Sequence, residues 1–232
     1  MTRLSLLTAL ALVAGCSTPP DYYHTLRPAV APAPTGARET QRVLAIGPVT
    51  IPDSLARDEW VIRTGDTGAM VYDHQLWTQG LAADVAQSLA DYLNRGALPE
   101  GLWADAGPTG SGSGADLDHP APLRVRVQVL RLDSILAPAP AVSDQLRWTI
   151  ECLPSDPALG PVDAGRYRMV RTAVRDAAEP APAGNAAVEV SQQRFDRIAR
   201  AHSETVRLVA DDIAAALRAS AAERARGCVG RP

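Results

Sequence analysis

The sequence predicts an α/β fold: a two-layer sandwich in which a mixed, largely antiparallel sheet packs against two amphipathic helices. Apolar and polar residues alternate over 123–129 and 145–152, as they do in strands with one buried face. Over 76–95 and 188–222 apolar residues instead recur every three or four positions, which is the period of an amphipathic helix. Strands on one side and helices on the other make two layers.

Shorter segments complete the expected sheet. The continuous apolar run over 42–49 predicts a buried strand that ends at Pro52, and 59–63 and 69–72 predict strands joined by a turn over 65–68. Residues 166–174 predict a looser strand, and Gly96 is expected to stop the first helix. His202 falls within the apolar stripe of the last helix, which predicts a core histidine rather than a ligand.

The N-terminus has the pattern of an export signal. Residues 4–13 form an apolar run of about ten residues, half of what a membrane-spanning helix needs. The segment Val13-Ala14-Gly15-Cys16 that follows resembles the lipobox of bacterial lipoproteins. We therefore expect residues 1–15 to be a removable signal peptide and Cys16 to be lipidated; an ordinary signal peptide with a chance cysteine is the alternative. Ser17, where Asp would favour retention in the inner membrane, favours the periplasmic face of the outer membrane.

Residues 16–41 are expected to form a Pro/Ala-rich tether behind the lipidated cysteine, and residues 42–232 a single domain. A Pro-rich chain rising ~3.1 Å per residue would hold that domain up to about 75 Å from the bilayer. Tyr22, Tyr23 and Leu26 are large apolar groups within this tether. They predict either a clasp between subunits or a segment that folds back and caps the edge of its own sheet, and both alternatives stay open.

Two cysteines remain besides Cys16. A bridge between Cys152 and Cys228 would suit an oxidising compartment and contribute about 4 kcal/mol in the chain-entropy model. Two free thiols are the alternative, with Cys152 expected on the buried face of its strand.

Composition and spacing give no sign of catalysis. The 23 basic residues are all arginine and are balanced by 26 acidic residues, without the basic block that nucleic-acid binding requires. No nucleophile elbow or phosphate-binding glycine loop is present, and Asp211 and Asp212 point apart on a helix. No pair among the histidines has metal-ligand spacing; they are His24, His74, His119 and His202. We therefore predict no catalytic, cofactor or metal site and a protein that is not an enzyme.

Several motifs resemble one family. They are Tyr22-Tyr23-x-x-Leu26, Leu44-x-Ile46-Gly47-Pro48-Val49-x-Ile51-Pro52-x-x-Leu55-x-Arg57, Trp60-Val61-x-Arg63-x-Gly65 and Trp77-x-x-x-Leu81. Together they resemble the PqiC family of ABC-type transport auxiliary lipoproteins, strongly over residues 22–95 and weakly beyond. Gln75 and the insertion over 106–122 depart from the family pattern.

The resemblance implies an accessory subunit of an MCE-type lipid transport system. Its partner would be an MCE-domain protein that forms a hollow tube, and the lipoprotein would be a docking collar at the tube tip in lipid trafficking and envelope integrity. A cyclic homo-oligomer would match such a tube. A lipid-binding periplasmic shuttle and a lipoprotein of unrelated envelope function are the alternatives. The motif residues also have structural roles to expect: Gly47, Pro48 and Pro52 shape a strand end, Trp77 packs the first helix on the sheet, and Arg63 pairs within the fold.

Overall fold

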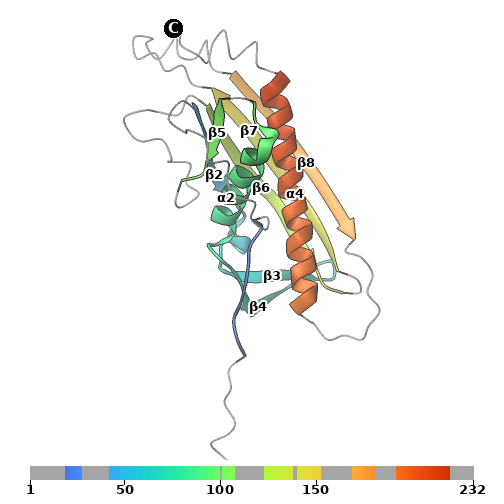
Figure 1. Cartoon of the computed structure of the whole chain (residues 1–232). Coiled ribbons are helices and arrows are strands. Elements are labelled where there is room, and N and C mark those ends of the chain that lie inside the picture. The colour runs from blue at the N-terminus through green and yellow to red at the C-terminus, as the bar shows by residue number, and fades with distance from the viewer. Residues whose placement is uncertain are drawn as a thin grey trace, which may run out of the picture.

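The computed structural model describes residues 19–27, 42–99, 101–107, 123–137, 140–152, 169–180 and 192–219. These residues form one mixed eight-stranded sheet with two α-helices packed on it (Figure 1), which confirms the predicted fold class. The elements in chain order are β1 (Tyr22–His24), β2 (Arg42–Thr50), a 3-10 turn (Asp53–Leu55), β3 (Glu59–Thr64), β4 (Gly68–Trp77), α2 (Leu81–Tyr92), a π-helical turn (Leu93–Ala97), β5 (Leu102–Asp105), β6 (Leu123–Ile135), β7 (Ala141–Cys152), β8 (Met169–Pro180) and α4 (Gln192–Ala219).

Strand β6 is the centre of the sheet. On one side it pairs along its length with β7, and β8 continues the sheet beyond β7. On the other side it pairs first with β2 and then, near its end, with β3. Beyond these lie β5, next to β2, and β4 followed by β1, next to β3. The pairs β3–β4, β6–β7 and β7–β8 are antiparallel and the others are parallel.

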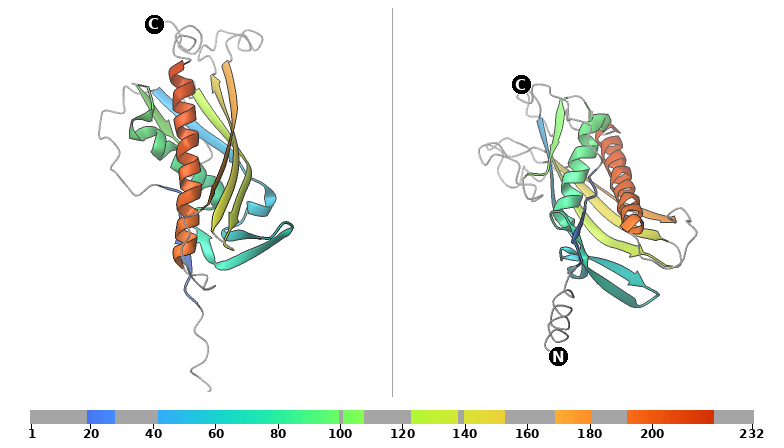
Figure 2. Two further views of the ribbon diagram at one scale, coloured as in Figure 1. Left: turned by 90° about the vertical axis from the view of Figure 1, so that its right-hand side faces the viewer. Right: turned by 60° about the horizontal axis from the view of Figure 1, so that its bottom comes forward.

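Both helices cover the same face of the sheet (Figure 2). The alternating residues of β6 and β7 explain this, because Val125, Val127, Leu146 and Ile150 are buried while the intervening arginines are not. The apolar stripe of α4 packs on them, and its buried members are Phe195, Ile198, Val206, Val209, Ile213 and Leu217. The opposite face of the central strands carries mainly polar side chains. Neither described helix combines the length and hydropathy needed to cross a bilayer.

The Gly47-Pro48 motif lies within a strand rather than at its end. The register of β2 on β6 shifts between Ile46 and Val49, so that both Gly47 and Pro48 lie opposite a single residue of β6. This is the geometry of a β-bulge. Gly47 adopts a φ of 121°, which a residue with a Cβ rarely reaches, and a cis peptide bond joins it to Pro48. The expectation that these residues shape a strand end is therefore corrected.

Some element boundaries also differ from the prediction. The first helix begins at Leu81 rather than Leu76, because Leu76 and Trp77 end strand β4 and Gly80, with φ of 74°, separates the two elements. Strand β6 runs on to Ile135 through a second register shift after Val129, which changes the phase of the alternation. Strands β1 and β5 were not predicted.

Candidate functional site

The N-terminal residues Tyr22–Arg27, which we call the docked segment, pack onto the domain. Strand β1 joins the sheet edge parallel to β4, with Tyr22 opposite Gln75 and His24 opposite Trp77. The ring of His24 is buried edge-on against Trp60 at 4.8 Å, and its Nε2 donates to Gln75 Oε1 at 2.6 Å. The prediction left two alternatives for this segment, and within the described residues it folds back and caps the sheet edge of its own domain.

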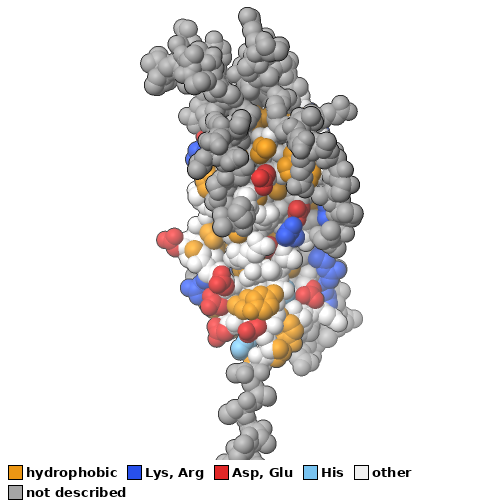
Figure 3. Space-filling view, turned by 60° about the vertical axis from the view of Figure 1, so that its left-hand side comes forward, with side chains coloured by type: hydrophobic (Ala, Val, Ile, Leu, Met, Phe, Trp, Pro, Cys, Tyr) orange, Lys and Arg blue, Asp and Glu red, His pale blue; other side chains and the backbone are white. Residues whose placement is uncertain are grey.

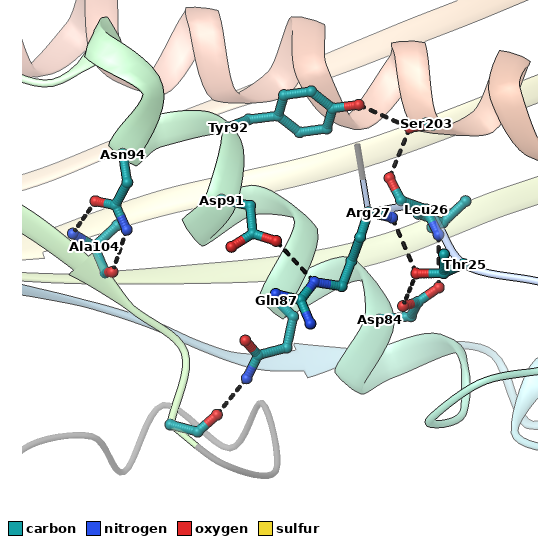
Figure 4. A network of polar contacts seen from close by, with 11 residues as sticks. Thr25, Leu26, Arg27, Asp84, Gln87, Asp91, Tyr92, Asn94, Ala104 and Ser203 are labelled. Carbon is teal, nitrogen blue, oxygen red and sulfur yellow. Dashed lines mark hydrogen bonds and ion pairs between the residues drawn. The ribbon is translucent and has the colours of Figure 1, made fainter. Parts of the chain in front are cut away.

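Leu26 lies between the two helices and is held from both sides (Figure 4). Its backbone N–H donates to Asp84 Oδ2 on α2 at 2.7 Å, and its carbonyl accepts from Ser203 Oγ on α4 at 2.6 Å. Thr25 Oγ1 donates to the other Asp84 oxygen at 2.8 Å. Because Ser203 gives its proton to Leu26, the hydroxyl of Tyr92, 2.8 Å away, donates to Ser203. The Leu26 side chain is 0% exposed and belongs to the core.

The electrostatics of this site centre on Asp84. Burial raises the pKa of the Asp84 carboxyl, and this effect outweighs the opposing hydrogen bonds from Leu26 and Thr25 and the charge of Arg27. Arg27 itself reaches along the surface to Asp91 on α2, with Nε 2.7 Å from Oδ2, and that hydrogen bond raises the pKa of the guanidinium. One buried carboxylate and one surface ion pair thus add to the strand pairing with β4 and the Ser203 hydrogen bond that hold the docked segment.

Tyr22 and Tyr23 point outward from the same segment. They are 40% and 64% exposed, and Asp21, which directly precedes them, is exposed as well. Asp21 pairs with His74 at 2.8 Å. Figure 3 shows hydrophobic side chains bordered by acidic ones at the end of the molecule formed by β3 and β4. Of the three residues predicted as a possible interface, Leu26 is thus occupied in its own core, while Tyr22 and Tyr23 are available to a partner.

The remaining predicted site residues are the cysteines. Cys16 and Cys228 lie outside the described residues, and of Cys152 only the backbone, opposite Leu123 at the end of β7, is described. Lipidation of Cys16 and the bridge between Cys152 and Cys228 therefore remain predictions. Of the motif residues, Arg63 has its expected role, since it pairs with Asp133 at 3.2 Å. Trp77 was expected to pack the first helix on the sheet; it instead ends strand β4, and its buried ring lies 4.4 Å from that of Trp60 on β3.

The core contains a serine, a histidine and an aspartate in series, which the sequence did not reveal. His202 Nδ1 lies 2.8 Å from Asp144 Oδ1, and His202 Nε2 lies 2.8 Å from Ser134 Oγ. Trp60 Nε1 donates to the same Ser134 oxygen at 2.8 Å. Because an indole can only donate, a consistent assignment has Ser134 donating to Nε2 and the His202 Nδ1–H donating to Asp144.

This arrangement has the order of a catalytic triad but not its accessibility. Ser134, His202 and Asp144 are each 0% exposed, so no substrate atom reaches the serine oxygen while the core is closed. The network instead satisfies every polar group that the core histidine brings with it. The predicted role of His202 as a core residue is confirmed. Within the described part of the chain, no group of three or more His, Cys, Asp and Glu side chains is placed to hold a metal ion.

Comparison with known proteins identifies the family. The family model of the ABC-type transport auxiliary lipoprotein component matches residues 24–214, which include the docked segment from His24 onward, all of α2 and most of α4. No curated protein sequence matches the chain.

Two solved structures share the fold. A crystal structure described only as that of an uncharacterized protein has 16% sequence identity and a TM-score of 0.55, and the match covers 86% of this chain and 99% of that one. A Xanthomonas campestris protein assigned to the DUF330 family has 14% identity and a TM-score of 0.53, with 88% and 98% covered. The predicted family is confirmed: the chain belongs to the ABC-type transport auxiliary lipoprotein components.

Proposed function

We propose that the protein is lipidated on Cys16, is anchored at the periplasmic face of the outer membrane, and serves an MCE-type lipid transport system as the docking collar of its tube. One observation carries the proposal beyond family membership: the domain itself holds two exposed tyrosines, Tyr22 and Tyr23, at the residues nearest the lipidated cysteine. Burying one such aromatic side chain contributes about 1.5–3 kcal/mol to the free energy of association. Two of them per subunit would therefore help to stabilise a cyclic oligomer.

The anchor geometry supports a collar. Because packing begins at strand β1, only residues 17–21 separate Cys16 from the domain. Five extended residues span at most about 18 Å, far less than the 75 Å expected of a tether that ran to residue 41. The β1–β4 end therefore faces the bilayer in the lipidated protein, and the height of the domain above the membrane is nearly fixed.

A shuttle that encloses lipid finds less support. Three surface hollows lined by described residues have volumes of roughly 340, 360 and 230 Å³. Each is bordered by charged side chains, whereas an acyl chain requires an apolar lining. The charged residues are Arg63, Arg131 and Asp133 in the first, Arg27, Asp196 and Arg200 in the second, and Arg126 and Arg147 in the third.

The proposal also holds that the protein is not an enzyme. A transport auxiliary family calls for no reaction, and the triad-like group formed by Ser134, His202 and Asp144 is sealed in the core. Purified protein is expected to show no hydrolysis of ester substrates, and Ser134→Ala is expected to alter stability alone.

The anchor is tested by labelling. Radiolabelled palmitate is expected to enter the full-length protein and to be lost in Cys16→Ser, while Cys152→Ser keeps the label. Fractionation of the envelope on a sucrose gradient is expected to place the labelled form with the outer membrane. Label in Cys16→Ser, or an inner-membrane position alone, contradicts the proposed anchoring.

The collar is tested on the full-length protein in detergent. Light scattering is expected to show a cyclic oligomer that Tyr22→Ser/Tyr23→Ser dissociates. Deleting residues up to Arg42 is a poor test, because it also removes Leu26 from the core.

A photo-crosslinking residue at Tyr23 is expected to capture a second copy and a co-expressed MCE-domain protein. The same residue at Ala215, exposed near the far end of α4, is the control and is expected to capture neither (Figure 1). A monomer, or equal capture at both positions, rejects the collar.

A further inference from the structure

The uncovered face of the sheet has a hollow beside the Gly47-Pro48 bulge. It has a volume of roughly 230 Å³ and is lined by side chains from three neighbouring strands, β2, β6 and β7. The lining residues are Pro48, Thr50, Arg126, Val127, Gln128, Arg147 and Thr149. Nothing in the docking role uses this hollow, since the docked segment lies at the other branch of the sheet, on β4.

The strand register explains how these side chains come together. Thr50, Gln128 and Arg147 are direct neighbours in one row across the three strands. In the next row Arg126 faces Thr149 on β7, and on its other side it faces the bulge. Without the extra residue of the bulge, β2 would stay in step with β6 and Pro48 would not border the hollow. The motif Gly47-Pro48 thus shapes one wall of the hollow.

The charges in the hollow are not balanced. Arg126 Nε pairs with Glu151 Oε2 at 3.0 Å, which fixes one side of that guanidinium. Arg147 is exposed, and no described residue forms an ion pair with it. Arg126 and Arg147 are diagonal neighbours, with Cα atoms about 7–8 Å apart, a spacing that long side chains can bridge. Two positive charges placed this close repel each other. A chain of net charge −3 thus keeps two arginines together, and among the described residues a single carboxylate, that of Glu151, forms an ion pair with them.

We propose that this hollow is a binding site for a phosphate group, supplied by a phospholipid headgroup or by a soluble phosphate. Two guanidinium groups, the hydroxyls of Thr50 and Thr149 and the amide of Gln128 border it. Guanidinium forks bind phosphate oxygens in pairs, and the hydroxyls and amide add donors for a tetrahedral group with more oxygens than a carboxylate has. A small hollow suits one compact anion better than an acidic peptide strand. The inference goes beyond the docking role and does not depend on it.

The test measures binding by isothermal titration calorimetry with the full-length protein in a nonionic detergent. The probes are inorganic phosphate, a short-chain monomeric phosphatidylglycerol and an oligo-glutamate peptide. Arg147→Gln removes the charge that forms no ion pair with a described residue. Arg131→Gln is the matched control, because Arg131 is half exposed on β6 and lies outside this hollow. Both substitutions are at the surface and are expected to leave the melting temperature unchanged.

Saturable binding of inorganic phosphate is expected, weakened about ten- to a hundred-fold by Arg147→Gln and less than about two-fold by Arg131→Gln. If phosphatidylglycerol binds at least as tightly with the same dependence, the source is a lipid headgroup; if only inorganic phosphate binds, the source is soluble. Absence of saturable binding, equal weakening by both substitutions, or binding of oligo-glutamate alone overturns the proposal.

Discussion

Replacing Leu26 by alanine tests whether residues 22–27 are docked on the domain or belong to a free tether. Leu26 is held through its backbone, by Asp84 on one side and Ser203 on the other, so the substitution leaves both hydrogen bonds available. What it removes is a fully buried isobutyl group between α2 and α4. Any loss of stability therefore reports on packing of this one side chain.

The expected loss follows from that burial. Leucine-to-alanine substitutions in a closed core cost about 2–5 kcal/mol, the larger values occurring where the surroundings cannot collapse into the cavity. Anchored on two helices, the backbone of this segment has little freedom to move inward. We therefore expect a loss near 3 kcal/mol in the free energy of unfolding, or about 6–12 °C in melting temperature for a chain of this size.

Urea unfolding followed by tryptophan fluorescence provides the assay. Trp60 and Trp77 are both buried, and their rings lie 4.4 Å apart beside the docked segment, so their emission reports the opening of this part of the core. Met70→Ala is the control, because Met70 is a large apolar residue that is 50% exposed and lies outside the proposed subunit interface. That variant is expected to change the unfolding free energy by less than about 0.5 kcal/mol.

Two results would refute the reasoning. If Leu26→Ala lowers the free energy of unfolding by less than about 0.5 kcal/mol, the segment does not contribute to the core. That result would favour a long tether that runs to residue 41. If the cost decreases on dilution of the protein, Leu26 is buried in a second copy rather than in its own domain.

Three further predictions concern stability. His202→Ala is expected to lower the unfolding free energy by about 3–5 kcal/mol in urea, because it leaves the carboxylate of Asp144 buried without its partner. Burial raises the pKa of Asp84 above 3.8, so its stabilising contribution is fully present below that value and is lost as the pH rises through the raised pKa. The stability difference between the native chain and Asp84→Ala should accordingly shrink as the pH is raised above about 4; a difference that grows contradicts the assignment. Gly68→Ala is expected to lower the melting temperature, because its Cβ would lie 2.6 Å from the carbonyl oxygen of Thr64; an unchanged value argues against this turn geometry.

The elements that could be predicted are those whose burial has a regular period. Residues 123–129 alternate because β6 has one face under the helices, and α4 shows its stripe because it lies on the sheet along its length. Strand β1 has three residues, of which only His24 is buried, so no period is readable. It exists because β4 offers an edge some fifty residues later in the chain, with His24 opposite Trp77, and local sequence carries no trace of that pairing.

The two buried polar networks were not predicted, but polar residues at core positions were a sequence signal for them. Asp144 alternates in phase with Val142 and Leu146 on the buried face of β7, and Asp84 falls on the buried face of α2. A carboxylate in such a position requires a partner, since burying it alone is costly. The partners lie far along the chain: His202 for Asp144, and the backbone of Leu26 for Asp84. The pattern could therefore have located both networks but not their members.

The way the segment is docked bears on the choice between collar and shuttle. A shuttle has to carry its ligand away from the membrane, which requires a long link, whereas a collar has to hold one height and orientation. With lipid on Cys16, the five residues 17–21 permit about 18 Å of travel, and the segment that follows is bonded to α2 through Asp84 and to α4 through Ser203. A displacement of the anchor would thus act on both helices through the hydrogen bonds of Leu26. Such a connection suits a ring held parallel to the bilayer, and lengthening it by inserting a flexible stretch after Ser17 should impair docking without altering the fold.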